Sequence, residues 1–221
     1  MHLRSLLFVA LATAGIGLAF AQTPAPAPVA KPAALSDNLP IPDAPAPATS
    51  KAWLIMDFAT GQVLAGENVD TPVEPASITK VMTSYVIAAE MAAGKVKATD
   101  PVMMSEHAWR EGGAGTDGSY SGFEVNKTAP LIDMEKGMVV QSGNDAAIAL
   151  AEHVAGSQQA FAQLMNAYAG KIGMKASRFV NPHGLTAAGH VTSARDLALL
   201  GRALIRDFPE AYSYNKIKEF T

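Results

Sequence analysis

The feature that most constrains the fold is the apolar segment "PASITKVMTSYVIAAEMAAG" at residues 75–94. Pro75 favours the start of a helix and Gly94 favours its end. Between them, apolar residues recur at intervals of three and four, at Ile78, Val81, Met82, Tyr85, Val86 and Ala89. A helix that is hydrophobic on most of its sides needs other elements around it. The sequence therefore predicts a central, buried helix.

The rest of the folded part predicts a β-hairpin before this helix and a helical cluster after it. Two β-prone runs, 52–58 and 63–69, flank a turn that contains Gly61. The glycine-rich stretch 100–125 interrupts the pattern and is predicted to be a mobile surface loop. Helices are then expected, with serine caps at two of them, at 129–138, 144–156, 157–173 and 192–209.

The hairpin needs further strands. Two strands alone rarely form a stable sheet. The last residues of the chain, "KIKEFT", are themselves β-prone at their tip. We therefore expect the sheet to be completed by residues beyond position 221.

The first 50 residues are predicted to be a leader and a tether. Arg4 gives a basic start to an apolar run, and "AFA" at 19–21 matches a small-x-small cleavage site. This pattern predicts a signal peptide at 1–21. An uncleaved membrane anchor is the alternative, but the apolar run is short for a spanning helix. The Pro- and Ala-rich stretch 22–50 predicts an extended linker, which leaves 51–221 as the folded domain.

The composition of the chain indicates its cellular compartment and the class of partner that it can bind. The chain has a formal net charge of −3 and no cysteine. A weakly acidic chain without a basic cluster argues against nucleic acid as a partner. An exported chain that forms no disulfide suits a bacterial periplasm or cell envelope.

The chemistry centres on Ser77 and Lys80, which open the apolar helix. Residues three positions apart share one helix face, so the lysine can reach the serine hydroxyl. A neutral lysine can act as the base for a serine nucleophile, and the apolar surroundings of the helix would favour that state. The spacing alone is weak, since Ser213 and Lys216 repeat it. That second pair lies in a polar segment after Pro209 with no apolar face following.

A second candidate element is "QSGND" at 141–145, just before another apolar helix. Ser142 could relay a proton between Lys80 and a leaving group, and Asn144 could offer its amide to a substrate carbonyl. The alternative is an ordinary turn and helix cap, for which Ser, Gly and Asn are also typical. The joint occurrence with Ser77 and Lys80 favours the functional interpretation.

Together, "PASITKVMTSYV" and "QSGNDAAIALAEHVAGS" resemble the active-site segments of low-molecular-mass penicillin-binding proteins, the D-alanyl-D-alanine carboxypeptidases. "NPHGL" at 181–185 and the run at 192–209 extend the resemblance over most of 51–221. It implies an α/β fold of the α+β type, a transpeptidase-like antiparallel sheet flanked by a helical cluster.

The resemblance also implies roles for single residues. Ser77 would be acylated by the D-Ala-D-Ala end of a peptidoglycan stem peptide, and Lys80 would be its general base. Ser142 would assist proton transfer, and Asn144 would help to hold the substrate. β-Lactams would acylate Ser77 as slow-leaving mimics. The family often has a C-terminal segment that associates with the inner membrane, which is not present in this sequence.

The sequence departs from the family pattern in one respect. The Lys-Thr-Gly motif of such enzymes is not present. "NKTA" at 126–129 is a near match without the glycine, and we interpret Lys127 as a solvated surface lysine. Three alternatives stay open: a peptidoglycan endopeptidase, a catalytically impaired peptidoglycan-binding homologue and, less favoured because Ser-Gly-Asn replaces Ser-Asp-Asn, a β-lactamase.

The histidines and aromatic residues give weaker signals. In "NPHGL", His183 is interpreted as a turn residue. The other histidines show no ligand spacing, so neither a zinc site nor another cofactor is expected. Packing or a place in a substrate cleft is expected for Trp109, Tyr120 and Phe123.

Overall fold

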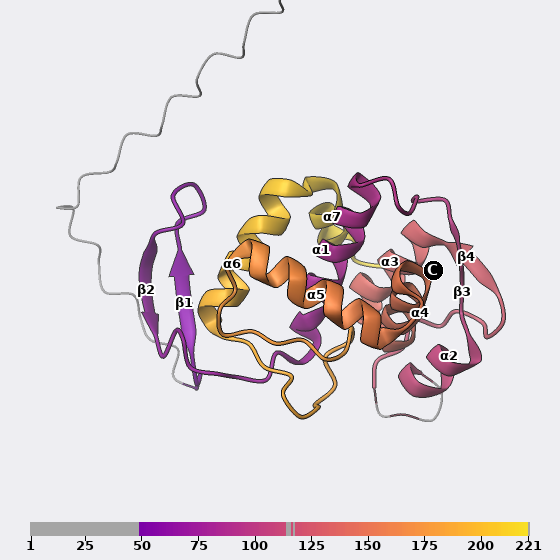
Figure 1. Ribbon diagram of the computed structural model, residues 1–221, viewed down its shortest axis with the longest axis horizontal. Coiled ribbons are helices and arrows are strands. Elements are labelled where there is room, and N and C mark those ends of the chain that lie inside the picture. Colours follow the sequence, from indigo (N-terminus) through magenta and orange to yellow (C-terminus); the bar gives the residue numbers. More distant parts are fainter. Residues whose placement is uncertain (1–48, 114–115, 117, 221) are drawn as a thin grey trace, which may run out of the picture. The chain divides into compact units, whose positions relative to one another are not determined.

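The computed structural model of the chain describes residues 49–113, 116 and 118–220 (Figure 1). The predicted signal peptide and all but the last two residues of the predicted linker lie outside the described residues. Across the part that is described, no helix combines the length and the apolar character needed to cross a membrane.

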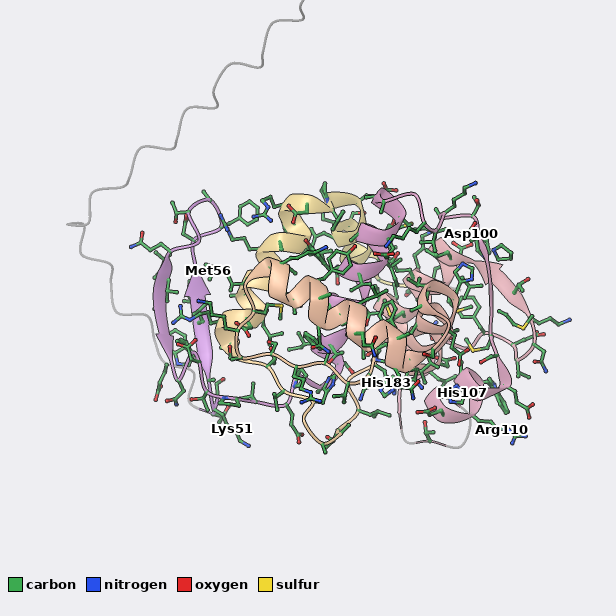
Figure 2. The ribbon with its side chains drawn as sticks, viewed as in Figure 1. Lys51, Met56, Asp100, His107, Arg110 and His183 are labelled. Carbon is green, nitrogen blue, oxygen red and sulfur yellow. The ribbon has the colours of Figure 1, made fainter. Side chains whose placement is uncertain are left out.

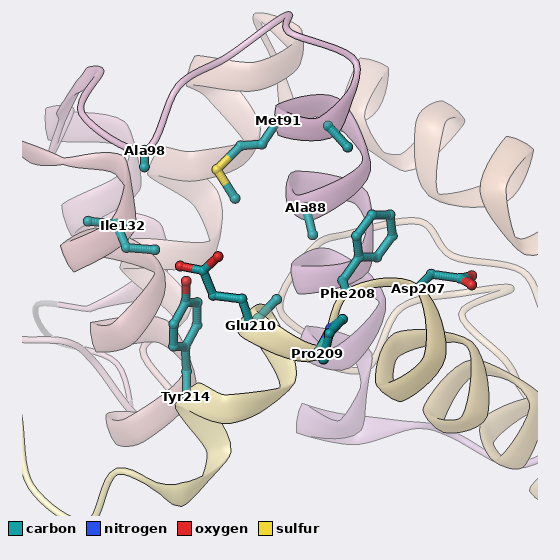
Figure 3. A pocket seen from close by; sticks show the side chains of 11 residues that line it. Ala88, Met91, Ala98, Ile132, Asp207, Phe208, Pro209, Glu210 and Tyr214 are labelled. Atoms are coloured by element: carbon teal, nitrogen blue, oxygen red, sulfur yellow. The ribbon is translucent and has the colours of Figure 1, made fainter. Parts of the chain in front are cut away.

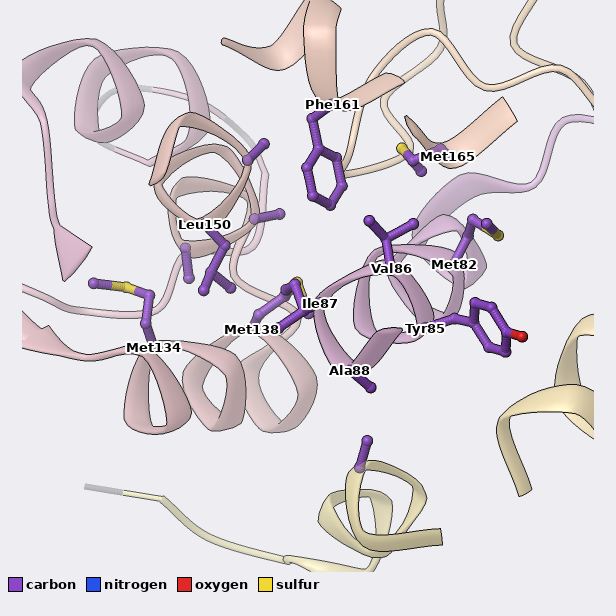
Figure 4. Packing of buried hydrophobic residues seen from close by; sticks show 14 of the residues in the cluster. Met82, Tyr85, Val86, Ile87, Ala88, Met134, Met138, Leu150, Phe161 and Met165 are labelled. Atoms are coloured by element: carbon purple, nitrogen blue, oxygen red, sulfur yellow. The ribbon is translucent and has the colours of Figure 1, made fainter. Parts of the chain in front are cut away.

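The predicted central helix is present as α1 (Thr79–Ala92), which follows a single 3-10 turn, η1 (Ala76–Ile78). Most of its residues are buried, and it contacts α3, α4, α5 and α6. Its side chains Met82, Val86 and Ile87 belong to one core with residues of those helices, as Figure 4 shows. The helix is buried on most sides because its apolar residues are not confined to one stripe.

The predicted helical cluster is confirmed. It consists of α3 (Leu131–Gln141), α4 (Asn144–Ala155), α5 (Gln158–Ile172), α6 (Ala194–Asp207) and α7 (Pro209–Ser213), followed by the 3-10 turn η2 (Tyr214–Lys216). The hydroxyls of Ser157 and Ser193 cap α5 and α6 by accepting backbone N–H bonds, as predicted.

The hairpin is confirmed as β1 (Trp53–Met56) paired antiparallel with β2 (Val63–Glu67). The register shifts between Ile55 and Met56. Helix α6 packs against β1. Together, sheet and helices give the mixed α/β fold of the α+β type that the sequence predicted.

The prediction of one continuous loop at 100–125 was wrong in its first half. That part contains β3 (Pro101–Met103) and α2 (Glu106–Gly112), and β3 pairs with β4 (Thr128–Pro130). The glycines suggested an irregular stretch, but Val102, Met104 and Ala108 are fully buried and fix it. Because 128–130 pairs as a strand, α3 begins at residue 131, two residues later than predicted.

The expectation for residues after Pro209 was also incomplete. Pro209 is the first residue of α7, where its fixed φ angle is favourable and its missing N–H costs nothing. Ala211 and Tyr214 are buried against the core, so this segment has an apolar face that its polar composition did not indicate.

Candidate active site

Ser77 and Lys80 lie together at the start of α1. Ser77 is exposed in η1, and Lys80 follows in the first turn of the helix, where its side chain is buried. Lys80 Nζ is 3.4 Å from Ser77 Oγ. The short 3-10 turn behind Pro75 produces this approach, because residues three apart in such a turn are stacked.

Three oxygen acceptors fix the Lys80 amine. Besides contacting Ser77 Oγ, Nζ donates to Asn144 Oδ1 at 2.7 Å and to the carbonyl oxygen of His183 at 2.9 Å. Burial lowers the pKa of Lys80 to about 8, against the opposing attraction of the Asp145 carboxylate. At pH 7 about a tenth of this amine is therefore uncharged, compared with less than a thousandth for an ordinary lysine, and a general base must be uncharged.

Ser77, Lys80 and Ser142 line the same small cavity, of about 100 Å³. Ser142 ends α3 in a left-handed conformation, with φ 57°, which turns the chain directly into α4. Asn144 is the first residue of α4 and joins the group through Lys80. The structure thus brings together all four of the residues selected from the sequence. The remaining walls are Val81, Ser84, Met138, Val139, Leu204 and Asn215.

A larger cavity, of about 470 Å³, lies further along α1, where Ala88 and Met91 face Phe208 and Tyr214 (Figure 3). Its walls are mainly apolar and contain no serine, lysine or histidine. Its titratable lining residues are Asp207, Glu210 and Tyr214. The Ser77 and Lys80 pair lines the smaller cavity instead.

His183 acts through its backbone. Its carbonyl accepts the Lys80 bond, while its ring nitrogen Nδ1 accepts the N–H of Leu185. Burial, with the nearby positive charge of Lys80, lowers the pKa of His183 to about 4, so the ring is neutral at physiological pH. The prediction of a turn residue is consistent with this geometry, but its carbonyl contact with Lys80 was missed.

Gly184 allows the segment 181–185 to lie directly against the turn that carries Ser77. A Cβ atom at position 184 would overlap the carbonyl oxygen of Ala76, and the φ angle of Gly184 is 94°. Both the space and the backbone conformation therefore require glycine. "NPHGL" gave a turn signal, but no local pattern indicated which element the turn would contact.

The other residues named from the sequence lie elsewhere. Trp109 and Phe123 are partly buried against the core, Tyr120 is exposed, and none of the three lines the small cavity. His107 and His183 lie in separate segments (Figure 2). His107 forms contacts with the carboxylates of Glu111 and Glu152. Within the described ranges, no three acidic or histidine side chains are placed to hold a metal ion. Lys127 is exposed, as expected.

Comparison with known proteins gives one consistent result. Residues 41–221 match the family model described as D-alanyl-D-alanine carboxypeptidase. The chain is 49% identical over 173 residues to D-alanyl-D-alanine carboxypeptidase DacC of Escherichia coli. The aligned region covers 78% of this chain and 43% of that protein. For DacA of the same organism, identity is 46% with the same coverage. The chain thus spans less than half the length of these curated relatives.

The solved structures agree with this result. Penicillin-binding protein 5 from Haemophilus influenzae superimposes with a TM-score of 0.76 at 39% identity, over 80% of this chain and 51% of that one. The similarity therefore extends from the sequence to the fold.

Proposed function

The chain belongs to the D-alanyl-D-alanine carboxypeptidase family, and from this we propose that it acts as a serine-type carboxypeptidase on peptidoglycan stem peptides. The observation that supports this proposal best is the contact between the buried Lys80 amine and the exposed Ser77 hydroxyl, 3.4 Å apart. A nucleophile and a base within reach form the minimum unit of covalent catalysis.

In the proposed reaction, neutral Lys80 accepts the proton of Ser77 while Oγ attacks the carbonyl carbon of the penultimate D-alanine. An ester bond forms between Ser77 and the peptide, and the bond to the terminal D-alanine breaks. The departing nitrogen receives a proton from Lys80, with the Ser142 hydroxyl as a relay. Water then attacks the ester and releases the shortened peptide.

Asn144 and the start of α1 would orient the substrate. Asn144 Oδ1 accepts the Lys80 bond, so its NH₂ group points away from the lysine and lies close to Gly118. In the proposed complex this group donates to a peptide carbonyl. Backbone N–H groups at a helix start are suited to a developing oxyanion. We place the protein in the cell envelope of a bacterium, exported by residues 1–21 and tethered by 22–50. β-Lactams would act there as inhibitors by forming a stable ester with Ser77.

The test is to incubate the full-length protein with a peptide ending in D-Ala-D-Ala, and separately with a fluorescent penicillin. We expect release of free D-alanine, and a covalent adduct that peptide mass mapping places on the segment containing Ser77. Cleavage of cross-linked muropeptides without release of D-alanine would make the protein an endopeptidase. The absence of any adduct would leave a peptidoglycan-binding homologue.

The rate of acylation should depend on pH in a defined direction. Because Lys80 acts as a base only when uncharged, and its pKa is about 8, the acylation rate constant should rise with pH and level off above about pH 8. Below about pH 8 we expect the acylation rate constant to fall about tenfold for each pH unit. Stopped-flow measurement with a chromogenic β-lactam between pH 5 and 10 checks this. A flat profile would exclude Lys80 as the base.

A further inference from the structure

The carboxylate of Asp145 lies directly behind the proposed active site and is completely buried. It is the second residue of α4, next to Asn144. Its Oδ1 accepts the backbone N–H of Ser121 at 2.8 Å, and its Oδ2 accepts the Ser121 hydroxyl at 2.7 Å. A buried carboxylate is costly unless its oxygens are paired in this way. Asp145 therefore ties the segment 118–123 to the start of α4.

The packing around this tie is close. The backbone N–H of Asn144 donates to the carbonyl of Ser119 at 2.9 Å, which adds a third bond between the two segments. A side chain at position 143 would come within 2.7 Å of Ser121 Cβ, so Gly143 is needed for the approach. The segment 118–123 thus supports the turn that holds Ser142 in its unusual left-handed conformation.

Asp145 also acts on Lys80 through charge. Asn144 Oδ1 holds the Lys80 amine, and the carboxylate of the next residue attracts the same amine. The other titratable group facing Lys80 is His183, which is neutral; α3, α6 and η2 contribute Met138, Val139, Ser142, Leu204 and Asn215, none of which is charged. Within the described residues, Asp145 is therefore the anion that stabilises the charged amine.

We propose that Asp145 is a positioning residue of the catalytic site, which holds Ser142 and Asn144 in place through Ser121 and electrostatically restrains the Lys80 amine. This inference rests on the proposed function. Asp145 touches no reacting atom, so its effect reaches the reaction through its neighbours. Two separable effects follow: loss of the tie lowers the rate at every pH, and loss of the charge moves the pH at which Lys80 becomes active.

Two variants separate these effects. Asp145→Asn keeps the size of the side chain but removes the charge, whereas Ser121→Ala removes one bond and leaves the carboxylate. We expect Asp145→Asn to lower the midpoint of the acylation pH profile by about half a unit to one unit, because neutral Lys80 is favoured when a nearby anion is removed. Its plateau rate should also fall. Ser121→Ala should lower the plateau about threefold to tenfold and keep the wild-type midpoint, the size expected from one hydrogen bond.

The measurement is the acylation rate constant against pH, with circular dichroism and the melting temperature as checks on folding. An unchanged midpoint in folded Asp145→Asn, or an unchanged plateau in Ser121→Ala, would overturn the proposal. If Asp145→Asn fails to fold, the plateau of Ser121→Ala decides. Failure of the proposed function looks different, since the wild-type protein itself would then form no adduct at Ser77.

Discussion

Replacing Ser77 with alanine should abolish covalent labelling by a fluorescent penicillin, whereas replacing Ser213 should leave it unchanged. Both serines precede a lysine by three residues, so the two variants are matched at the level of sequence. Only Ser77 has its lysine buried and within 3.4 Å; the Ser213 hydroxyl instead donates to the carbonyl of Glu210, and Lys216 is exposed. We expect a loss of about a thousandfold or more for Ser77→Ala, typical of removing a nucleophile.

The two serine variants can be compared directly because neither substitution should disturb the fold. Ser77 is exposed and Ser213 lies near the surface, so each removes little packing. Gel fluorescence after a fixed incubation, with intact-mass spectrometry on the same samples, measures the adduct. If labelling survived in Ser77→Ala and disappeared in Ser213→Ala, the nucleophile would be Ser213, with Lys216 as its base.

The second large effect concerns stability and involves Glu135, a buried carboxyl group on α3. Glu135 is 0% exposed, and neither oxygen of its carboxyl group has a hydrogen-bond partner among the described residues. Burial raises the pKa of Glu135 from 4.5 to about 8, because the charged form loses its hydration, and the charge of Glu210 adds to this rise. The nearby Ser84 hydroxyl opposes the rise only weakly, since it forms no hydrogen bond with either oxygen of Glu135. The folded protein thus keeps the neutral acid over a range in which the unfolded chain ionises.

The sign of the pH dependence follows directly. A raised carboxyl pKa means that the folded state holds its proton more tightly, so the free energy of unfolding falls as pH rises from 4.5 to about 8. Over the whole range the loss is up to about 5 kcal/mol. Glu135→Leu should remove this slope and stabilise the protein most at pH 9, where the wild type carries an unpaired buried charge.

Urea unfolding at pH 5, 7 and 9 tests this prediction. The matched control is Glu124→Leu, because Glu124 is exposed and no packing or buried charge is involved. We expect the control to follow the wild-type curve within about 0.5 kcal/mol. Parallel curves for Glu135→Leu and the wild type would show that Glu135 does not titrate as its burial indicates.

Much of the fold could be predicted because its signals are local. Helix α1, the helices α4 to α6 and the hairpin all show a short period with clear caps or turns, and each was placed within a few residues. The segment containing β3 and α2 could not be placed in the same way. Its order depends on distant contacts, such as the bonds that Met104 makes to Asn126 and Lys127, and on Ser121 meeting Asp145.

The residues of the candidate site show the same contrast between local signals and distant contacts. Ser77 and Lys80 could be paired from their spacing, and Ser142 and Asn144 from their place before a helix. The groups that hold the lysine could not be found in this way, since the carbonyl of His183 lies 103 positions away in the sequence. Asp145 was missed because a single acidic residue at a helix start is ordinary, and only the fold shows what it binds. Glu135 was missed although Leu131, Ile132, Met138 and Val139 place it on the apolar face of α3, because a glutamate is rarely fully buried.

The contact between Gly184 and Ala76 links two distant parts of the chain at a position without any functional group. Ala76 is itself held at φ 47°, an unfavourable angle for alanine that the surrounding structure must maintain. The position of the Ser77 hydroxyl therefore depends on a residue that has no side chain. Under the proposed function, a substitution at position 184 would lower activity even though Ser77, Lys80, Ser142 and Asn144 were all unchanged.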